Sequence, residues 1–441
     1  MKYYLCYIGI IINLASLFYS CDENPQQPPI HAQSTILTAE EVGVTEVWLR
    51  IRLSPFYQSV VIKRSDRSDT LIKLQAVSPQ TLPSDTLILD NNSVLPHHQY
   101  TYSAFLGRKF KLYTIPETDS ITVITMDTTS HDFQWHLDTL GDGASSILFD
   151  IAIINDTLAY AVGKIYKKDS TGQFENEPYN LAIWNGKQWS LLRLSYQGIA
   201  PPIRSIIAVS ENNIWLDPWF HWNGQSFEVI LVDPVFWGMR TLKMWGNSSE
   251  LYAVGTAGFI AHFNGSTWQK LESGTTLDIQ DIWGALNPKT NQEEIIAAAG
   301  NPDVSFDHKI LSISDTVVKS MPDSGIFPHA LTTIWFSPGR KYWLGGGGVW
   351  DKDISLDWGL WHELYPTPYY TNRIRGNDIN DVFICGAYGD LLHFNGQSWR
   401  SYHDQTKISD GGFNSIAITG SLVLSVGEDN PRAVVAIGRR K

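Results

Sequence analysis

Short runs of alternating apolar and polar residues dominate the chain from about residue 34 to its end. Examples are "TEVWLRIRL", "LYAVG" and "RAVVAIG", and Gly, Asn, Asp, Ser or Pro bound most of these runs. Alternation with a period of two is typical of β-strands, and the bounding residues favour turns. The runs lack the wider spacing of apolar positions that an amphipathic helix requires. The pattern therefore predicts an all-β protein.

A four-strand unit repeats from about residue 131 onward. One complete copy, "LKMWGNSSELYAVGTAGFIAHFNGSTWQKLESG", covers residues 242–274 and predicts an antiparallel meander of four strands. The residue that ends its second strand returns at steps of 54, 38, 45, 45, 41 and 41 residues. Periods near 40 to 45 residues are typical of the blades of a β-propeller. The recurring positions are Gly163, Asp217, Gly255, Gly300, Gly345, Gly386 and Gly427.

An Asn-Gly turn and an aromatic residue mark the outer part of the unit. The dipeptide stands in "FNG" and "WNG" and favours the positive φ of a tight hairpin turn. An aromatic residue then begins the outer strand, at Trp189, Phe227, Trp268 and Trp399, with Trp361 matching less closely. We expect these side chains to pack between blades, and a platform for a sugar is the alternative.

The last unit is one strand short. Its strands "FNSIAITG", "SLVLSVG" and "RAVVAIGRRK" end with the chain, whereas "DFQWHLDTLGDG", ahead of the first unit, resembles the missing fourth strand through Trp135. We expect this N-terminal strand to complete the last blade and close the ring, which removes exposed strand edges. Closure predicts seven blades. Six is the alternative, because residues 293–320 match the repeat poorly.

The repeats resemble those of bacterial secreted propellers, whose units carry W-G, then D/E-x-Y-A-V-G, then G-x-I-x-H-x-N-G-x-x-W. The resemblance covers roughly residues 131–441 and is best over residues 244–271 and 375–402. Photosystem-assembly propellers and sialidase-like repeats are similar with lower specificity. The resemblance implies a scaffolding or recognition role and no particular activity.

Residues 34–130 have a different sequence pattern from the repeats. Their six or seven short predicted strands suggest a β-sandwich. Trp48 in an early strand and the later "LPHHQYTYSAF" resemble the landmarks of a fibronectin type III domain. The resemblance implies structural roles for Trp48, Leu95, Tyr100 and Tyr102. We predict a fibronectin type III-like domain over residues 34–130 and a propeller over residues 131–441.

The amino terminus has the pattern of an export signal. Lys2 precedes an apolar run from Tyr3 to Phe18, too short for the ~20 residues of a membrane-spanning helix. The ending "FYSCDEN" resembles a bacterial lipoprotein signal, which implies a signal peptide over residues 1–20 and lipidation of Cys21; a plain secretory signal is the alternative. Residues 21–33 then form a Pro- and Gln-rich linker. We expect an exported lipoprotein of the bacterial outer membrane or cell surface, with a periplasmic or secreted protein as the alternative.

Charge and cysteine content narrow the possible chemistry. The formal net charge of -12 argues against nucleic acid as a partner. Of the three cysteines, Cys6 would leave with the signal and Cys21 would carry lipid, so that only Cys385 remains, and we expect it to be a buried, inert thiol. The sequence shows no motif for a metal, a cofactor or a catalytic residue. It therefore predicts neither a cofactor nor an enzyme.

One Pro-broken insertion, "DWGLWHELYPTPYY", is rich in aromatic residues. It supplies a candidate ligand-binding loop, because loops often carry function: Trp358, Trp361, Tyr365, Tyr369 and Tyr370. Local packing of these side chains is the alternative. The sequence favours a non-catalytic envelope lipoprotein whose propeller binds an extracellular or envelope protein, or a polysaccharide. A glycosidase or lyase on a propeller scaffold is the alternative, and it would need two carboxylates facing one cleft.

Overall fold

The computed structural model describes residues 36–53, 57–75, 82–108, 117–217, 220–230, 233–302, 306–326, 329–353 and 360–441. Its chain divides into two compact units. The smaller unit contains residues 48–88 and 100–123 together with residues before 41, and the larger contains residues 41–47, 89–99 and 124–441. The predicted signal peptide, linker and Cys21 lie outside the described residues. Within the described part of the chain, no helix is long and apolar enough to cross a membrane.

Two sheets form between residues 37 and 124. One contains β1 (Leu37–Val42), β2 (Val47–Arg52) and β5 (Asp85–Asp90), and the other has the order β4 (Ile72–Gln75), β3 (Tyr57–Arg64), β6 (Gln99–Arg108) and β7 (Glu117–Ile124). Tyr100 and Tyr102 are fully buried. Trp48 is half-buried, because its neighbour Leu49 takes the core-facing side of β2. Leu95 is 55% exposed, and its backbone carbonyl accepts a hydrogen bond from the Thr125 hydroxyl.

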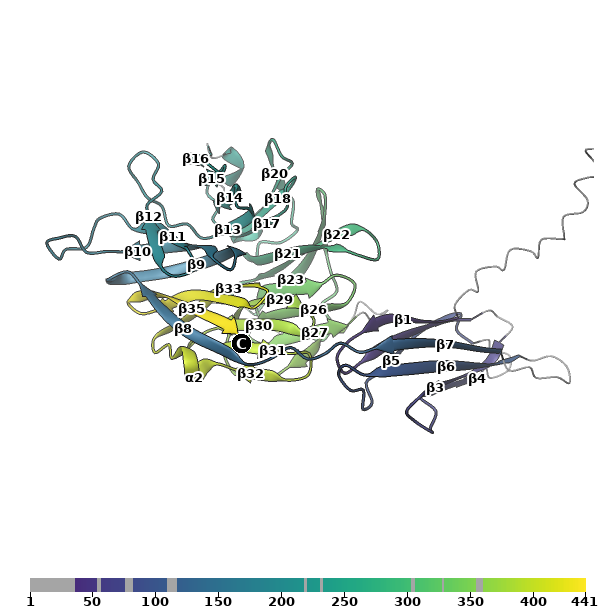
Figure 1. Cartoon of the computed structure of the whole chain (residues 1–441). Helices are drawn as coiled ribbons and strands as arrows, with labels where there is room; N and C mark the ends of the chain where they lie inside the picture. The colour runs from purple at the N-terminus through teal and green to yellow at the C-terminus, as the bar shows by residue number, and fades with distance from the viewer. Residues whose placement is uncertain are drawn as a thin grey trace, which may run out of the picture. The chain divides into compact units, whose positions relative to one another are not determined.

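Seven four-stranded antiparallel sheets follow in the described part of the larger unit (Figure 1). The first sheet contains β9 (Gly143–Asn155), β10 (Leu158–Tyr166), β11 (Tyr179–Trp184) and β12 (Trp189–Leu192). The second contains β13 (Ile206–Ser210), β14 (Asn213–Leu216), β15 (Phe220–Trp222) and β16 (Phe227–Val229). The third contains β17 (Thr241–Gly246), β18 (Leu251–Gly255), β19 (Ile260–Phe263) and β20 (Trp268–Leu271). The fourth sheet contains β21 (Ile279–Asn287), β22 (Gln292–Gly300), β23 (His308–Ser314) and β24 (Val317–Ser320). The fifth contains β25 (Leu331–Ser337), β26 (Lys341–Gly346), β27 (Val349–Asp353) and β28 (His362–Leu364). The sixth contains β29 (Thr371–Asp378), β30 (Asp381–Gly386), β31 (Leu391–Phe394) and β32 (Trp399–Ser401). Each of these six sheets is a meander in chain order, as the repeat predicts.

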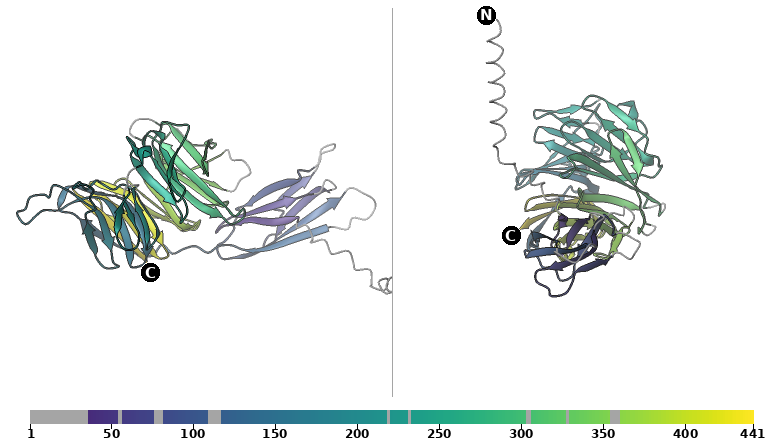
Figure 2. Two further views of the ribbon diagram at one scale, coloured as in Figure 1. Left: turned by 90° about the horizontal axis from the view of Figure 1, so that it is seen from above. Right: turned by 90° about the vertical axis from the view of Figure 1, so that its right-hand side faces the viewer.

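The seventh sheet joins the two ends of the unit. It contains β33 (Gly411–Thr419), β34 (Leu422–Asp429), β35 (Arg432–Arg440) and, as its fourth strand, β8 (Phe133–Leu140). β8 runs antiparallel to β35, with Trp135 opposite Gly438, and Figure 2 shows the C-terminus at this sheet from two sides. The predicted pairing of the Trp135 strand with the last strand of the chain is confirmed.

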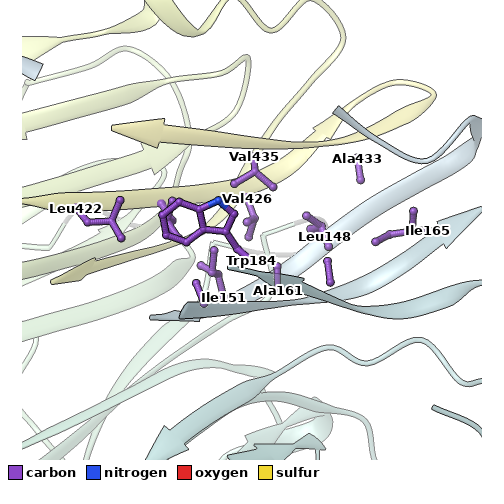
Figure 3. Close-up of a cluster of buried hydrophobic side chains, with 12 residues drawn as sticks. Leu148, Ile151, Ala161, Ile165, Trp184, Leu422, Val426, Ala433 and Val435 are labelled. Atoms are coloured by element: carbon purple, nitrogen blue, oxygen red, sulfur yellow. The ribbon is translucent and has the colours of Figure 1, made fainter. Parts of the chain in front are cut away.

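Apolar side chains fill the space between consecutive sheets. The interface that closes the set packs Leu148 and Trp184 of the first sheet against Val426 and Val435 of the last (Figure 3). Similar clusters lie between each of the other pairs of consecutive sheets. Burial of such side chains contributes roughly 1.5–3 kcal/mol for each Val, Leu or Ile, so sheet-to-sheet packing is the main stabilising term.

The recurring glycine has a steric cause. A Cβ atom on Gly386 would lie 2.1 Å from the carbonyl oxygen of Tyr370, and one on Gly427 would lie 1.9 Å from that of Gly412. These carbonyls belong to the neighbouring strand next to a β-bulge, so the backbones approach too closely for a side chain. Gly255 and Gly163 have the same relation to the backbone carbonyls of the adjacent strand.

Two of the predicted glycine positions are off by one residue. Gly386 pairs with Thr371, the first residue of β29, and the residue that pairs with Leu331, the first residue of β25, is Gly346. Gly346 is therefore the equivalent of Gly386 in β26, where the repeat predicted Gly345. In β22 the corresponding residue is Ala299, one before Gly300. The repeat therefore tolerates a small side chain at this place in one sheet.

Candidate functional site

The first strands of the seven sheets surround a common axis. β9, β13, β17, β21, β25, β29 and β33 each contact the next in this order, and β33 contacts β9. Residues from six of these strands line a single cavity. The sheets therefore form a closed ring around this axis.

A polar residue stands directly before an Ile or Met in each first strand or, for Ser205, immediately ahead of it. We call these seven residues the polar layer: Asp150, Ser205, Lys243, Asp281, Thr333, Arg373 and Ser415. All seven are buried. Six of them lie next to a β-bulge, which turns the side chain away from the regular alternation of the strand.

Asp150 is held by four strong contacts. The Lys243 ammonium donates to its two carboxylate oxygens at 2.7 and 2.6 Å. The Ser415 hydroxyl donates at 2.7 Å and the Ile206 backbone N–H at 3.0 Å. Burial alone would raise the pKa of Asp150, but Lys243 and Arg373 outweigh it and hold this pKa below its usual range.

Asp281 has an even denser set of donors. Arg375 forms a bidentate pair with it at 2.9 and 2.8 Å, and the Arg373 guanidinium lies 2.6 Å from the same carboxylate. Thr333 Oγ1 donates at 2.8 Å and the Ile334 backbone N–H at 3.1 Å. Burial opposes ionisation, yet the two arginines hold the pKa of Asp281 well below its ordinary value.

On the C-terminal side of the polar layer, the first strands enclose a mostly apolar cavity of about 250 Å³, which we call the apolar mouth. Ile and Ala side chains form most of its wall, Trp245 and Trp283 contribute aromatic surface, and Lys243 and Arg375 supply charge. Ile153, Ile207 and Trp245 are only half-buried. The cavity therefore offers apolar surface backed by charges that are already paired.

On the N-terminal side of the polar layer lies a second cavity, of about 170 Å³, which we call the arginine cavity. Arg204 and Arg373 both line it, together with amide and hydroxyl side chains of the first strands. The two cavities thus differ in chemical character.

The repeat aromatics lie at the positions predicted for them, at or near the start of the outer strand of their sheets. Trp268 packs against Trp215 and Phe236 from the adjoining part of the ring, and Trp135 lies 5.1 Å from the Tyr402 ring. Trp189 donates through its indole to Asp138 of β8, and Phe227 and Trp399 stack on aromatic partners within their own sheets. Their contacts are those of packing residues.

The aromatic loop is not one surface. Trp361 is 4% exposed and packs in a core cluster with Trp350, as the alternative of local packing predicts. Tyr365 is 83% exposed, whereas Tyr370 donates its hydroxyl to the Ala330 backbone. Tyr369 lies beside the Tyr388 and His403 rings, and Trp358 is outside the described residues.

Cys385 is fully buried in β30, and burial raises the pKa of its thiol to about 12. A thiol with this pKa is almost entirely protonated at neutral pH and is a poor nucleophile. In the parts of the chain that the structure describes, no group of His, Cys, Asp and Glu has the arrangement of a metal site.

Sequence reasoning missed the polar layer, although a signal was present. Each first strand contains or directly follows a polar residue that precedes Ile or Met, as in "FDIAI", "LKMWG", "QDIWG" and "NRIRG". Aligning the repeats on this pair, instead of on the later glycine, places all seven polar residues at one level. The signal was hidden because Asp, Lys, Arg, Ser and Thr alternate there without a shared identity.

No protein-family model and no curated protein matches this sequence. Among solved structures, the chain is similar to YCF48 bound to D1 peptide, with 16% sequence identity, a TM-score of 0.53, and coverage of 71% of this chain and 100% of that one. It is also similar to YCF48 from Cyanidioschyzon merolae, at 13% identity and a TM-score of 0.49 over 69% of this chain and 98% of that one. The WD40 beta propeller domain of Doa1 matches at 12% identity and a TM-score of 0.49 over 70% and 97%. At such identities the likeness concerns the fold alone, and the fold is that of an all-β protein with a β-propeller.

Proposed function

We propose that this chain is a non-catalytic envelope lipoprotein whose seven sheets are the blades of one propeller, and that the apolar mouth binds a segment of a protein partner. A fibronectin type III-like domain then separates the propeller from the lipidated Cys21. The apolar mouth carries the proposal, because apolar side chains that reach the surface at a ring axis favour insertion of an apolar side chain from outside.

The polar layer supports a binding role over a hydrolytic one. A glycosidase or lyase needs a carboxyl group that is free to exchange a proton or to attack. Asp150 and Asp281 are instead saturated by cations and hydrogen bonds, and both have lowered pKa values. Such carboxylates act as structural anchors.

The fold comparison is compatible with this role. YCF48, at a TM-score of 0.53, was solved bound to D1 peptide. A peptide is also the kind of ligand that a cavity of about 250 Å³ with Trp and Ile walls accommodates, one side chain at a time.

Site-specific crosslinking tests the proposed partner. Photoreactive p-benzoylphenylalanine replaces Ile207 at the apolar mouth in the full chain, produced in its native cells, and a matched variant carries it at Leu192 on the outer strand β12. We expect one defined protein adduct from position 207 and none from position 192. Identical adducts from both positions, no adduct, or an adduct with a glycan would each contradict a protein partner at the mouth.

Replacement of the lipidated residue tests the proposed address. Cys21→Ala removes the only thiol at the expected cleavage site, so the protein should move from the membrane fraction to the soluble fraction when envelopes are separated by centrifugation. Cys385→Ala is the matched control and should remain with the membranes, because that thiol is buried in β30. A Cys21→Ala protein that still sediments with the membranes would refute lipid anchoring.

A further inference from the structure

The polar layer and Arg375, which pairs with Asp281, together carry more positive than negative charge. Asp150 and Asp281 supply two carboxylates, whereas Lys243, Arg373 and Arg375 supply three cations. Burial of an unbalanced charge is costly, so a compensating anion stabilises such a cluster. The net charge of these five side chains is one positive elementary charge.

Arg373 is the cation of this cluster that lines the arginine cavity. It is 7% exposed, and its Nε atom has no hydrogen-bond partner among the described residues. In the parts of the chain that the structure describes, its one ion pair joins Nη1 to Asp281, and this carboxylate also accepts the bidentate contact of Arg375. Guanidinium donors therefore remain for a ligand.

Arg204 brings a second cation to the same cavity. Its guanidinium stacks on the Phe149 ring at 4.4 Å, and within the described parts of the chain it forms no salt bridge. Asp217 accepts the backbone N–H groups of Arg204 and Ser205, and burial raises the pKa of Asp217 to about 7. At neutral pH this carboxyl group is only partly ionised and is a weak counter-ion.

Polar side chains complete the lining. The amides of Asn372, Asn414 and Gln280 each donate one N–H to a neighbouring backbone carbonyl, which fixes their orientation. A primary amide has a second N–H, so each keeps one donor. The cavity thus combines two guanidinium groups with additional neutral donors.

We propose that the arginine cavity binds a carboxylate group. A carboxylate carries the single negative charge that the polar layer and Arg375 together lack, and its planar fork of two oxygens matches a guanidinium. The volume of about 170 Å³ suits one such group, either in a small free acid or at the end of a peptide. This site lies on the opposite side of the polar layer from the apolar mouth and does not depend on what binds there.

Calorimetric titration of the full chain with sodium acetate tests this site, with sodium chloride at equal ionic strength as the reference. We expect saturable heat with acetate and none with chloride. Arg204→Gln should weaken acetate binding by about tenfold or more, because it removes a charged donor. The matched variant Arg432→Gln, on the exposed part of β35, should bind acetate like the unmodified protein.

Acetyl-trialanine with a free or an amidated C-terminus separates the two sources of the carboxylate. Binding of acetate alone indicates a small free acid, and binding of the free-acid peptide but not of its amide indicates a peptide terminus. The proposal fails if acetate gives no more heat than chloride, or if Arg204→Gln and Arg432→Gln bind acetate equally well. Circular dichroism of each variant establishes that it is folded.

Discussion

Asp281→Ala will lower the free energy of unfolding of the propeller by about 3–5 kcal/mol. The substitution removes the carboxylate that faces both Arg373 and Arg375, and it leaves two buried guanidinium groups without their counter-ion. It also frees the Thr333 hydroxyl and the Ile334 N–H, which donate to the same group. Urea denaturation followed by circular dichroism measures the change.

A surface ion pair provides the control for Asp281. Asp132 pairs with Lys441 at 3.4 Å, and both side chains are more than half exposed. Solvent screens such a pair, so Asp132→Ala should cost less than about 1 kcal/mol. If both substitutions cost the same, the polar layer does not hold the ring together.

Trp184→Ala will destabilise the ring at its closing interface by about 3–5 kcal/mol. Trp184 is 2% exposed and packs between the first and the last sheet, against side chains such as Val426 and Val435 (Figure 3). Removal of the indole leaves a cavity at the interface that joins the two ends of the propeller. The free energy of unfolding of a typical domain is only about 5–15 kcal/mol, so the loss expected for Trp184→Ala is a large fraction of the total stability.

Trp237→Ala is the matched control for the closing interface. Trp237 is 71% exposed, and its truncation should change the free energy of unfolding by less than about 0.5 kcal/mol. The same urea titration compares the two variants. A small effect of Trp184→Ala would show that the first and last sheets contribute little to the stability of each other.

Much of the propeller could be predicted from the sequence, because blade strands carry strong local signals. Alternation, Asn-Gly turns and the glycine period identify the repeating strands, and the incomplete last unit identifies the partner of β8. Errors of one residue arose where a bulge shifts the register, as between Gly345 and Gly346. The bulge depends on contact between strands, which single-strand patterns do not contain.

The candidate site was much less predictable. Trp361 and Tyr365 belong to the same aromatic stretch, yet one is buried and the other exposed, because tertiary packing decides which side of the loop meets the core. Arg204 and Arg373 lie far apart in sequence and line one cavity only after the ring closes. A local sequence pattern contains no information about which distant strands come into contact.

The pairing of β8 with β35 also constrains the order of folding. Roughly 300 residues separate the two strands, so the entropic cost of bringing them together falls late in the assembly of the ring. As the chain leaves the ribosome, β8 emerges before every blade and has no partner until residues 432–440 are made. The ring thus completes the hydrogen bonding of its seventh sheet only once residues 432–440 have been made.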